Sequence, residues 1–526
     1  MNAHISLSAR HELDGTLAAI LIVAAVASLG CTSGTARPAV TRETTMTSLA
    51  QPPVLLPVSA DPTVSFRISF SLGSQDDPPG KEGLAYLTAT MMVEGATTAH
   101  SYPEILKLLY PMAAGYDVRI DKERTTFSGR VHRDNLDAYT TLLLDALMHP
   151  AFAEDDFLRL KQRTLDTITK TLRFASDEEL GKAVLYDTVF AGTPYGHLTM
   201  GTVAGLESIT LADVRAFWNR HFTRESVTVG LGGGFDPSLL ARLTSSLTQL
   251  PAAAPPTVGK PGVRPIEGRK LVIVSKPGPA TAISFGFPIP VLRGSREFYA
   301  LWLANSWLGE HRNSASHLYQ VIREDRGMNY GDYSYIEFFP EAGSRSRPPT
   351  CVPRRVQLFE VWIRPVQNAQ AHFALRAAVR EVERLAAHGL SEEEFELTKG
   401  FLAKYCLHFA ETTSDRLGYA LDDRAYGIPS PGHLANFRAI IPTLTRDEVN
   451  AAIRSYIKPD NMVIAMVSQD AQALADAIAA EKASPITYAT PKPPEVLAED
   501  EEIQVFPLHI SKAAITVVPV EQAFAR

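Results

Sequence analysis

The sequence has few cysteines and no excess of positive charge, and these two shortages limit what the protein can be. Only three cysteines occur among 526 residues, too few for a disulfide-stabilised scaffold. The net charge is −7, with no basic tail or stripe, which argues against nucleic acid as a partner. A chain of this length is too long for one hydrophobic core, so we expect two or more domains.

Long apolar runs are also scarce. The main candidate, residues 17–30, reads LAAILIVAAVASLG and ends at Cys31. It is too short to span a bilayer comfortably and fits the core of a signal peptide better. A cysteine directly after such a core is typical of a bacterial lipoprotein, so Cys31 is a candidate lipidation site. Cleavage after Ala25-Val26-Ala27 and a membrane anchor are the open alternatives. All three predict an extracytoplasmic protein, and the first predicts a lipid-anchored protein of the bacterial periplasm.

The rest of the chain divides at two segments without apolar periodicity. Residues 32–53 are rich in Thr, Ser, Ala and Pro and are interpreted as a flexible tether after the signal segment 1–31. Residues 251–262 (PAAAPPTVGKPG) indicate an interdomain linker. The expected domains are therefore 54–250 and 263–483.

The two expected domains resemble each other. SITLADVRAFWNRHFTRESVTVGLGGG (208–234) and TLTRDEVNAAIRSYIKPDNMVIAMVSQ (443–469) share a threonine cap, an acid in the first helical turn and a following strand. A repeat of this size predicts two homologous α+β domains. Long amphipathic helices beside few strands predict, in each domain, an antiparallel sheet covered on one face by helices.

One glycine-rich segment could be mistaken for a nucleotide site. GLGGGF (230–235) follows an expected strand, but Phe235 stands where the dinucleotide fingerprint needs a third glycine. No βαβ unit surrounds it. The repeat explains it better, as the loop after the last strand of the first domain.

The helix expected after the first strand begins GLAYLTATMMVEGAT (83–97). This segment, together with the repeat, resembles the pitrilysin/insulinase family of zinc metallopeptidases. That family carries an inverted zinc motif, His-x-x-Glu-His, on this helix. Here Tyr86 and Thr90 stand at the two histidine positions and Ala89 stands at the glutamate position. The resemblance implies a third ligand, a glutamate, on a helix about 75 residues later, where Asp166 is the only acid in 160–172.

These replacements remove the chemistry of the motif. Positions i and i+4 share one helix face, so two histidines there can bind one zinc ion. Tyr86 and Thr90 keep the spacing but are poor zinc ligands, and Ala89 lacks the carboxylate that would act as general base. We therefore expect no metal in this chain. His311 and His317 could meet in space as a replacement, but they belong to the second domain.

A second motif lies in the second domain. LYQVIREDRGMNYGDYSY (318–335) resembles the family's Arg-Glu-x-x-Gly-Leu-x-Tyr run, with Arg323 and Tyr330 at the Arg and Tyr positions. The resemblance implies that these two side chains bind substrate backbone and stabilise an oxyanion, as a guanidinium and a phenol can. The alternative is that Arg323 belongs to a charged helix end and Tyr330 packs at the start of a strand.

A lost zinc motif and a retained Arg/Tyr pair imply a second chain. The resemblance suggests a non-catalytic subunit of an extracytoplasmic peptidase, in which a homologous partner supplies zinc and both chains enclose extended peptides. Two alternatives stay open: a proteolytically inactive peptide-binding or structural envelope protein, and a stand-alone peptidase with an unrecognised metal site.

The tail, 484–526, begins Pro-rich, becomes acidic at Glu499–Glu502 and ends with the alternating AAITVVPV. This alternation predicts a final strand that packs on a domain or on the partner. Cys351 and Cys406 could pair or could be isolated thiols.

Overall fold

A computed structural model describes residues 49–253, 261–339 and 347–526. The predicted signal segment, Cys31 and most of the tether therefore lie outside the described residues, as does the centre of the predicted linker. We call the described residues up to 253 the first half and those from 261 onward the second half; both belong to one compact unit.

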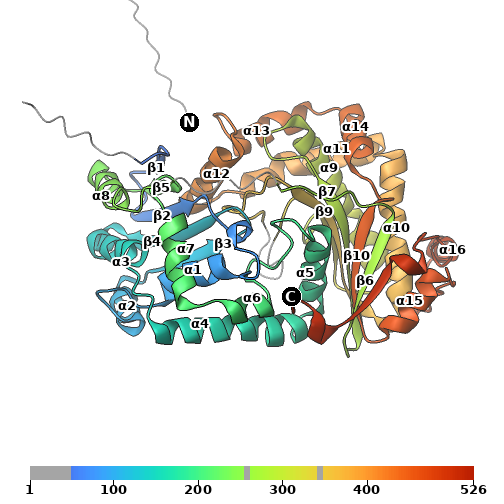
Figure 1. Ribbon diagram of the computed structural model, residues 1–526. Coiled ribbons are helices and arrows are strands. Elements are labelled where there is room, and N and C mark those ends of the chain that lie inside the picture. Colours follow the sequence, from blue (N-terminus) through green and yellow to red (C-terminus); the bar gives the residue numbers. More distant parts are fainter. Residues whose placement is uncertain (1–48, 254–260, 340–346) are drawn as a thin grey trace, which may run out of the picture. The chain divides into compact units, whose positions relative to one another are not determined.

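The first half contains a five-stranded sheet with the order β1-β5-β2-β4-β3 (Figure 1). Its strands are β1 (Val54–Pro57), β2 (Thr63–Phe70), β3 (Gly115–Ile120), β4 (Thr125–His132) and β5 (Val227–Gly233). In β2, Phe66 and Ile68 are fully buried against helices, whereas Arg67 between them points to the opposite face. The period of two thus gives this sheet one apolar and one polar face.

Helices of the first half lie mainly on the apolar face. They are α1 (Leu84–Glu94), α2 (Tyr102–Leu109), α3 (Leu136–Met148), α4 (Glu154–Asp166), α5 (Asp177–Val189), α6 (Val203–Ser208), α7 (Leu211–His221) and α8 (Pro237–Leu247). A π-helical turn, Thr167–Leu172, continues α4.

The second half contains a six-stranded sheet with the order β11-β6-β10-β7-β9-β8. Its strands are β6 (Arg269–Ser275), β7 (Ala280–Ile289), β8 (Asp332–Tyr335), β9 (Gln357–Gln367), β10 (Met462–Ser468) and β11 (Ile515–Pro519). The predicted final strand is confirmed as β11, which pairs with β6.

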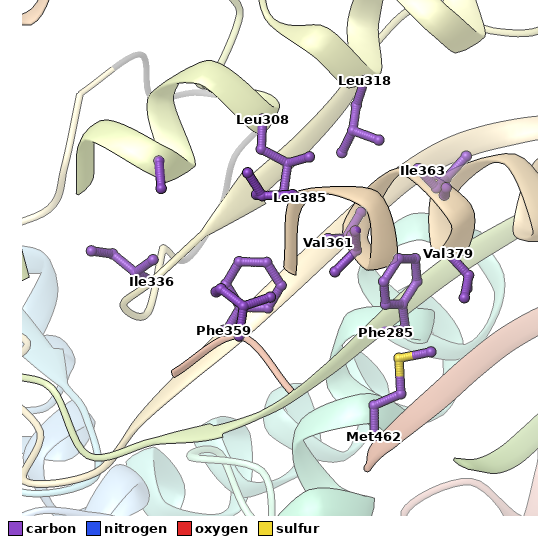
Figure 2. Close-up of a cluster of buried hydrophobic side chains, with 14 of the residues drawn as sticks. Phe285, Leu308, Leu318, Ile336, Phe359, Val361, Ile363, Val379, Leu385 and Met462 are labelled. Carbon is purple, nitrogen blue, oxygen red and sulfur yellow. The ribbon is translucent and has the colours of Figure 1, made fainter. Parts of the chain in front are cut away.

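Helices of the second half are α9 (Arg296–Gly309), α10 (Ala371–His388), α11 (Glu392–Tyr405), α12 (Thr413–Tyr426), α13 (His433–Ile440), α14 (Arg446–Tyr456), α15 (Ala471–Ala479) and α16 (Pro494–Ile503). A second π-helical turn is Tyr319–Glu324. Figure 2 shows the core between sheet and helices, where Phe285 of β7 and Val361 of β9 face Val379 of α10.

The α+β fold with two helix-covered sheets is confirmed, but both sheets are mixed rather than purely antiparallel. β1 runs parallel to β5, and β6 runs parallel to both β10 and β11. Parallel neighbours need long crossover connections, and helices separate the strands of each parallel pair in the sequence. The parallel pairs, β1–β5 in one sheet and β11–β6–β10 in the other, lie toward one end of each sheet, and local periodicity cannot reveal them.

The two halves also exchange helices, which the sequence did not predict. α5 of the first half packs on β7, β10 and β9 of the second sheet. α12 of the second half packs on β5, β1 and β2 of the first sheet. Gly230 of β5 allows this approach, because a Cβ there would lie 3.1 Å from a methyl group of Leu421. Each sheet thus has its own helices on one face and a helix of the other half on the opposite face.

The repeat signature is confirmed at both ends. Thr210 and Thr445 cap α7 and α14, and in each case the carboxylate three residues later accepts a hydrogen bond from the threonine amide. β5 and β10 follow at corresponding places. GLGGGF, predicted to be the loop after this strand, instead contributes 230–233 to β5, and only its last two residues lie in the loop. Within the described residues, no helix is long and apolar enough to cross a membrane.

Candidate functional site

The helix α1 carries the positions that the sequence singled out. Its N-cap is Gly83, whose φ of 105° favours glycine. Asp77 caps it: the amides of Gly83 and Ala85 each donate to its carboxylate at 2.7 Å. The helix is buried on nearly all sides, which explains why it is apolar all round.

The three motif positions have different surroundings. Ala89 is fully buried and Thr90 is 3% exposed, so both pack in the first-half core. Tyr86 is half-buried and lines a cavity. A methyl group, a hydroxyl and a phenol do not form a zinc-binding set at neutral pH. That these positions correspond to the family's zinc motif stays a prediction.

An arginine of α4 takes part in the contact between α4 and α1. Arg163 donates to both carboxylate oxygens of Glu94, with Nη2 at 2.8 Å from Oε1. The bond with Glu94 raises the pKa of Arg163, and Tyr86 acts in the same direction. Since Glu94 lies eight residues after Tyr86, both share one face of α1. A guanidinium therefore sits beside the helix face on which the sequence motif would place a metal.

Asp166, the one acid in residues 160–172, does not face this site. It accepts hydrogen bonds from Lys170 at 2.8 Å and Gln162 at 3.0 Å, all on its own helix. These bonds lower its pKa. The carboxylate is paired locally rather than directed toward α1.

Tyr86 opens onto a cavity of about 640 Å³. Charged side chains from β2, β3 and the turn after β3 line it together with several aromatic rings. The described residues that line the cavity include Arg67, Asp117, Arg119, Asp121, Lys122, Tyr186, His197, Phe338, Phe339, Arg354 and Trp362. Both halves of the chain thus contribute to one cavity.

A buried ion pair joins the halves at this cavity. Arg354 Nε and Nη2 donate to the Asp121 carboxylate at 2.8 and 2.6 Å, and both side chains are at most 3% exposed. The guanidinium also lies 3.4 Å from the ring centroid of Phe338. Although burial opposes its charge, Asp121 raises the pKa of Arg354 above the ordinary value.

Two further groups in the cavity have perturbed protonation. Lys122 is 4% exposed and donates to the carbonyl of His197. Burial and, to a smaller extent, the charge of Arg354 lower the pKa of Lys122 to about 7. Burial also raises the pKa of Asp187 to about 6. The cavity therefore holds groups that can change charge near neutral pH.

β3 gives the cavity a hydrogen-bonding edge. It is one of the two edge strands of the first sheet, and residues 117–122 line the cavity. An edge strand presents unpaired amide and carbonyl groups to which an extended peptide can add. The arrangement can therefore hold a peptide backbone beside charged and aromatic side chains.

Arg323 and Tyr330 lie elsewhere. Among the described residues, neither lines this cavity. Arg323 is in the second π-helical turn, pairs with Glu324 and lies 5.0 Å from the Tyr319 ring centroid. Tyr330 is 79% exposed just before β8. Gly327 adopts a φ of 67°, as a turn glycine between the two would.

The histidines considered as a replacement metal site have separate partners. His311 Nδ1 lies 2.6 Å from the Tyr335 hydroxyl, and His317 Nε2 lies 2.6 Å from the Glu381 carboxylate. In residues 49–253, 261–339 and 347–526, no group of three metal-ligating side chains is found. Cys351 and Cys406 are both free thiols.

Sequence reasoning missed the residues that build the cavity. Asp121 and Arg354 are 233 positions apart, and no local pattern links them. One available signal was that a charged residue interrupts an expected strand, as Arg67 does in β2; the strand that carries Arg119, β3, was not predicted.

Comparison with known proteins agrees with the fold. Residues 54–203 match Insulinase (Peptidase family M16), and residues 208–402 match the Peptidase M16 inactive domain. An uncharacterized zinc protease of Streptomyces coelicolor is 26% identical over 434 residues, 79% of this chain and 88% of that protein. One from Mycobacterium tuberculosis is 24% identical over 398 residues, 74% of this chain and 85% of that protein.

A solved structure shows the same fold. The crystal structure of a peptidase M16 inactive domain from Pseudomonas fluorescens matches with a TM-score of 0.68 and 21% identity, covering 78% of this chain and 94% of that chain. The two consecutive family matches, the related sequences and the paired helix-covered sheets show that this chain belongs to the M16, or insulinase, family of peptidases.

Proposed function

We propose that this M16 chain is the non-catalytic subunit of an extracytoplasmic zinc peptidase. A homologous partner would carry the zinc, and this chain would supply a peptide-binding wall together with Arg323 and Tyr330. The observation that carries the proposal is the contrast between the two motifs. The zinc-motif positions hold Tyr86, Ala89 and Thr90, whereas Tyr330 is 79% exposed and free to reach a second chain.

The chemistry of Arg323 and Tyr330 supports this division of roles between two chains. A guanidinium and a phenol are donors that can stabilise the oxyanion formed when zinc-bound water attacks a peptide carbonyl. Since neither side chain lines the cavity within this chain, their reacting partner would be outside it. Extended peptides are the proposed substrates, because the edge strand β3 offers backbone hydrogen bonds.

The test is co-purification with a zinc-bearing homologue, followed by hydrolysis of an unfolded peptide. Arg323→Ala and Tyr330→Phe should each lower turnover by about 10²–10³-fold, as loss of an oxyanion donor does, and should leave assembly intact. Arg416→Ala and Tyr110→Phe are matched controls, since Arg416 bonds only weakly to its own helix end and Tyr110 is 86% exposed in the first half. Unchanged turnover in both test variants would refute the proposal.

A second candidate function is peptide binding without cleavage. It is favoured by the cavity itself, which one chain builds completely from its two halves. Binding of an unfolded peptide by the single chain, with no hydrolysis by the co-purified complex, would support it. Hydrolysis by the single chain with bound zinc would instead support the third candidate, a stand-alone peptidase.

Location is part of the proposal. Lipidation of Cys31 would hold the chain on a membrane facing the periplasm. Cys31→Ser should then move the protein from the membrane fraction to the soluble periplasmic fraction. The same distribution for both proteins would contradict lipidation.

A further inference from the structure

The residues after β11 leave the second sheet and cross to the first half (Figure 1). We call residues 520–525 the strap. Val520 is 1% exposed, and Ala523 and Phe524 are each 6% exposed. All three belong to a hydrophobic cluster that combines the first-half core with the α5-covered face of the second sheet, and not to the core beneath the other face of that sheet. The strap is therefore buried where the two halves meet.

Backbone hydrogen bonds fix the strap at the start of α6. The amides of Val203 and Ala204 donate to the carbonyls of Phe524 and Ala525 at 3.0 and 3.1 Å. The first amides of a helix have no partner within the helix. The side chain of Thr202 satisfies only the amide of Gly205, at 3.0 Å. The strap thus completes the cap of a helix that is distant in sequence.

An arginine makes the third attachment. Arg173 Nε and Nη2 donate to the carbonyl of Ala523 at 2.9 and 2.6 Å. The Arg173 side chain is buried, being 7% exposed, so its guanidinium, with these two donors, is held rigidly. Arg173 directly follows the π-helical turn Thr167–Leu172.

Both attachment points adjoin the cavity wall. Leu172, which precedes Arg173, lines the cavity, and residues 197–200, just before α6, line it as well. We propose that the strap positions this wall: when seated it fixes residues 197–200, and when released it lets them move and widens the cavity. The proposal does not depend on the proposed peptidase function. It concerns access to the cavity, whatever ligand the cavity takes.

The test measures amide hydrogen exchange on the full chain. Phe524→Ala removes the buried ring, and Arg173→Gln removes the fork. Each variant should speed amide exchange in residues 197–206 by about tenfold. This is the effect expected when a segment loses stabilisation comparable to that of one hydrogen bond. Exchange in β4 should stay unchanged. Arg242→Gln is the control, since Arg242 is also a first-half arginine but binds Thr141 and Asp137 on α3.

Phe524→Leu gives a second readout, because a leucine keeps most of the apolar volume and should retain protection of residues 197–206. Exchange in this segment that matches the natural chain in both test variants would overturn the proposal. An equal rise in β4 would overturn it too, since the strap would then stabilise the whole chain rather than this wall.

Discussion

Removal of the carboxylate of Asp121 should strongly lower the free energy of unfolding. The Arg354 side chain is 2% exposed and directs two donors to Asp121 at 2.6 and 2.8 Å. Asp121→Ala leaves this guanidinium buried and without its counter-charge. Breaking one partner of a buried pair costs about 3–5 kcal/mol. The expected loss in the free energy of unfolding is therefore about 3–5 kcal/mol, measured by urea unfolding followed by tryptophan fluorescence.

Two further variants make this prediction sharp. Asp121→Leu combined with Arg354→Met removes both charges and should cost less than Asp121→Ala alone, because no unpaired charge stays buried. Asp137→Ala is the control for an exposed pair: Asp137 lies 3.4 Å from Arg242 and is fully exposed, so the loss should stay within about 0.5 kcal/mol. The reasoning would be refuted if Asp121→Ala lowered the free energy of unfolding by less than about 1 kcal/mol. It would also be refuted if the loss in the double variant equalled the sum of the losses in its two single variants.

Two more predictions concern metal and pH. A chain that carries four substitutions together should retain stoichiometric zinc through gel filtration: Tyr86→His, Ala89→Glu, Thr90→His and Arg163→Glu. The natural chain should retain none. Zinc in the natural chain would contradict the predicted loss of the metal site. Burial, with the nearby Arg220 charge, lowers the pKa of His221 to about 4 from 6.5. The unfolded chain then binds more protons between these values, so stability present at pH 6.5 is lost as pH falls to 4. His221→Phe should reduce that loss by up to roughly 3 kcal/mol in unfolding experiments; an unchanged pH profile would contradict it.

The sequence predicted the features that local chemistry determines. The capping boxes at Thr210 and Thr445 follow from residues three positions apart, and so does the repeat that they mark. β2 was predictable because Phe66 and Ile68 alternate with polar residues. The family was suggested by resemblance, through the repeat and the segments around Tyr86 and Arg323.

The cavity was not predictable, because it depends on contacts between distant segments. The acidic run at the tail illustrates the same difficulty at another place in the chain. Glu499 and Asp500 in α16 bind Arg326 at 2.8 Å, and Glu499 also binds Arg380 at 2.8 Å. In the sequence this run was only a change of composition. The role of these carboxylates depends on which arginines the fold brings next to them, and these arginines lie more than 100 positions away in the sequence.

The helix exchange has a consequence for synthesis on the ribosome. N-terminal segments fold first as a chain emerges. α5 is complete before the second sheet is made, and the face that it covers is apolar, with Ala282, Val463 and Val467. α12 is made long after the first sheet, and the sheet face awaiting it carries Arg67, which donates to Ser414 of α12, and two glycines, Gly230 and Gly232, that lie against α12. Of the two sheet faces, the one that waits in water for its helix is thus the polar one, which lowers the risk of aggregation during translation.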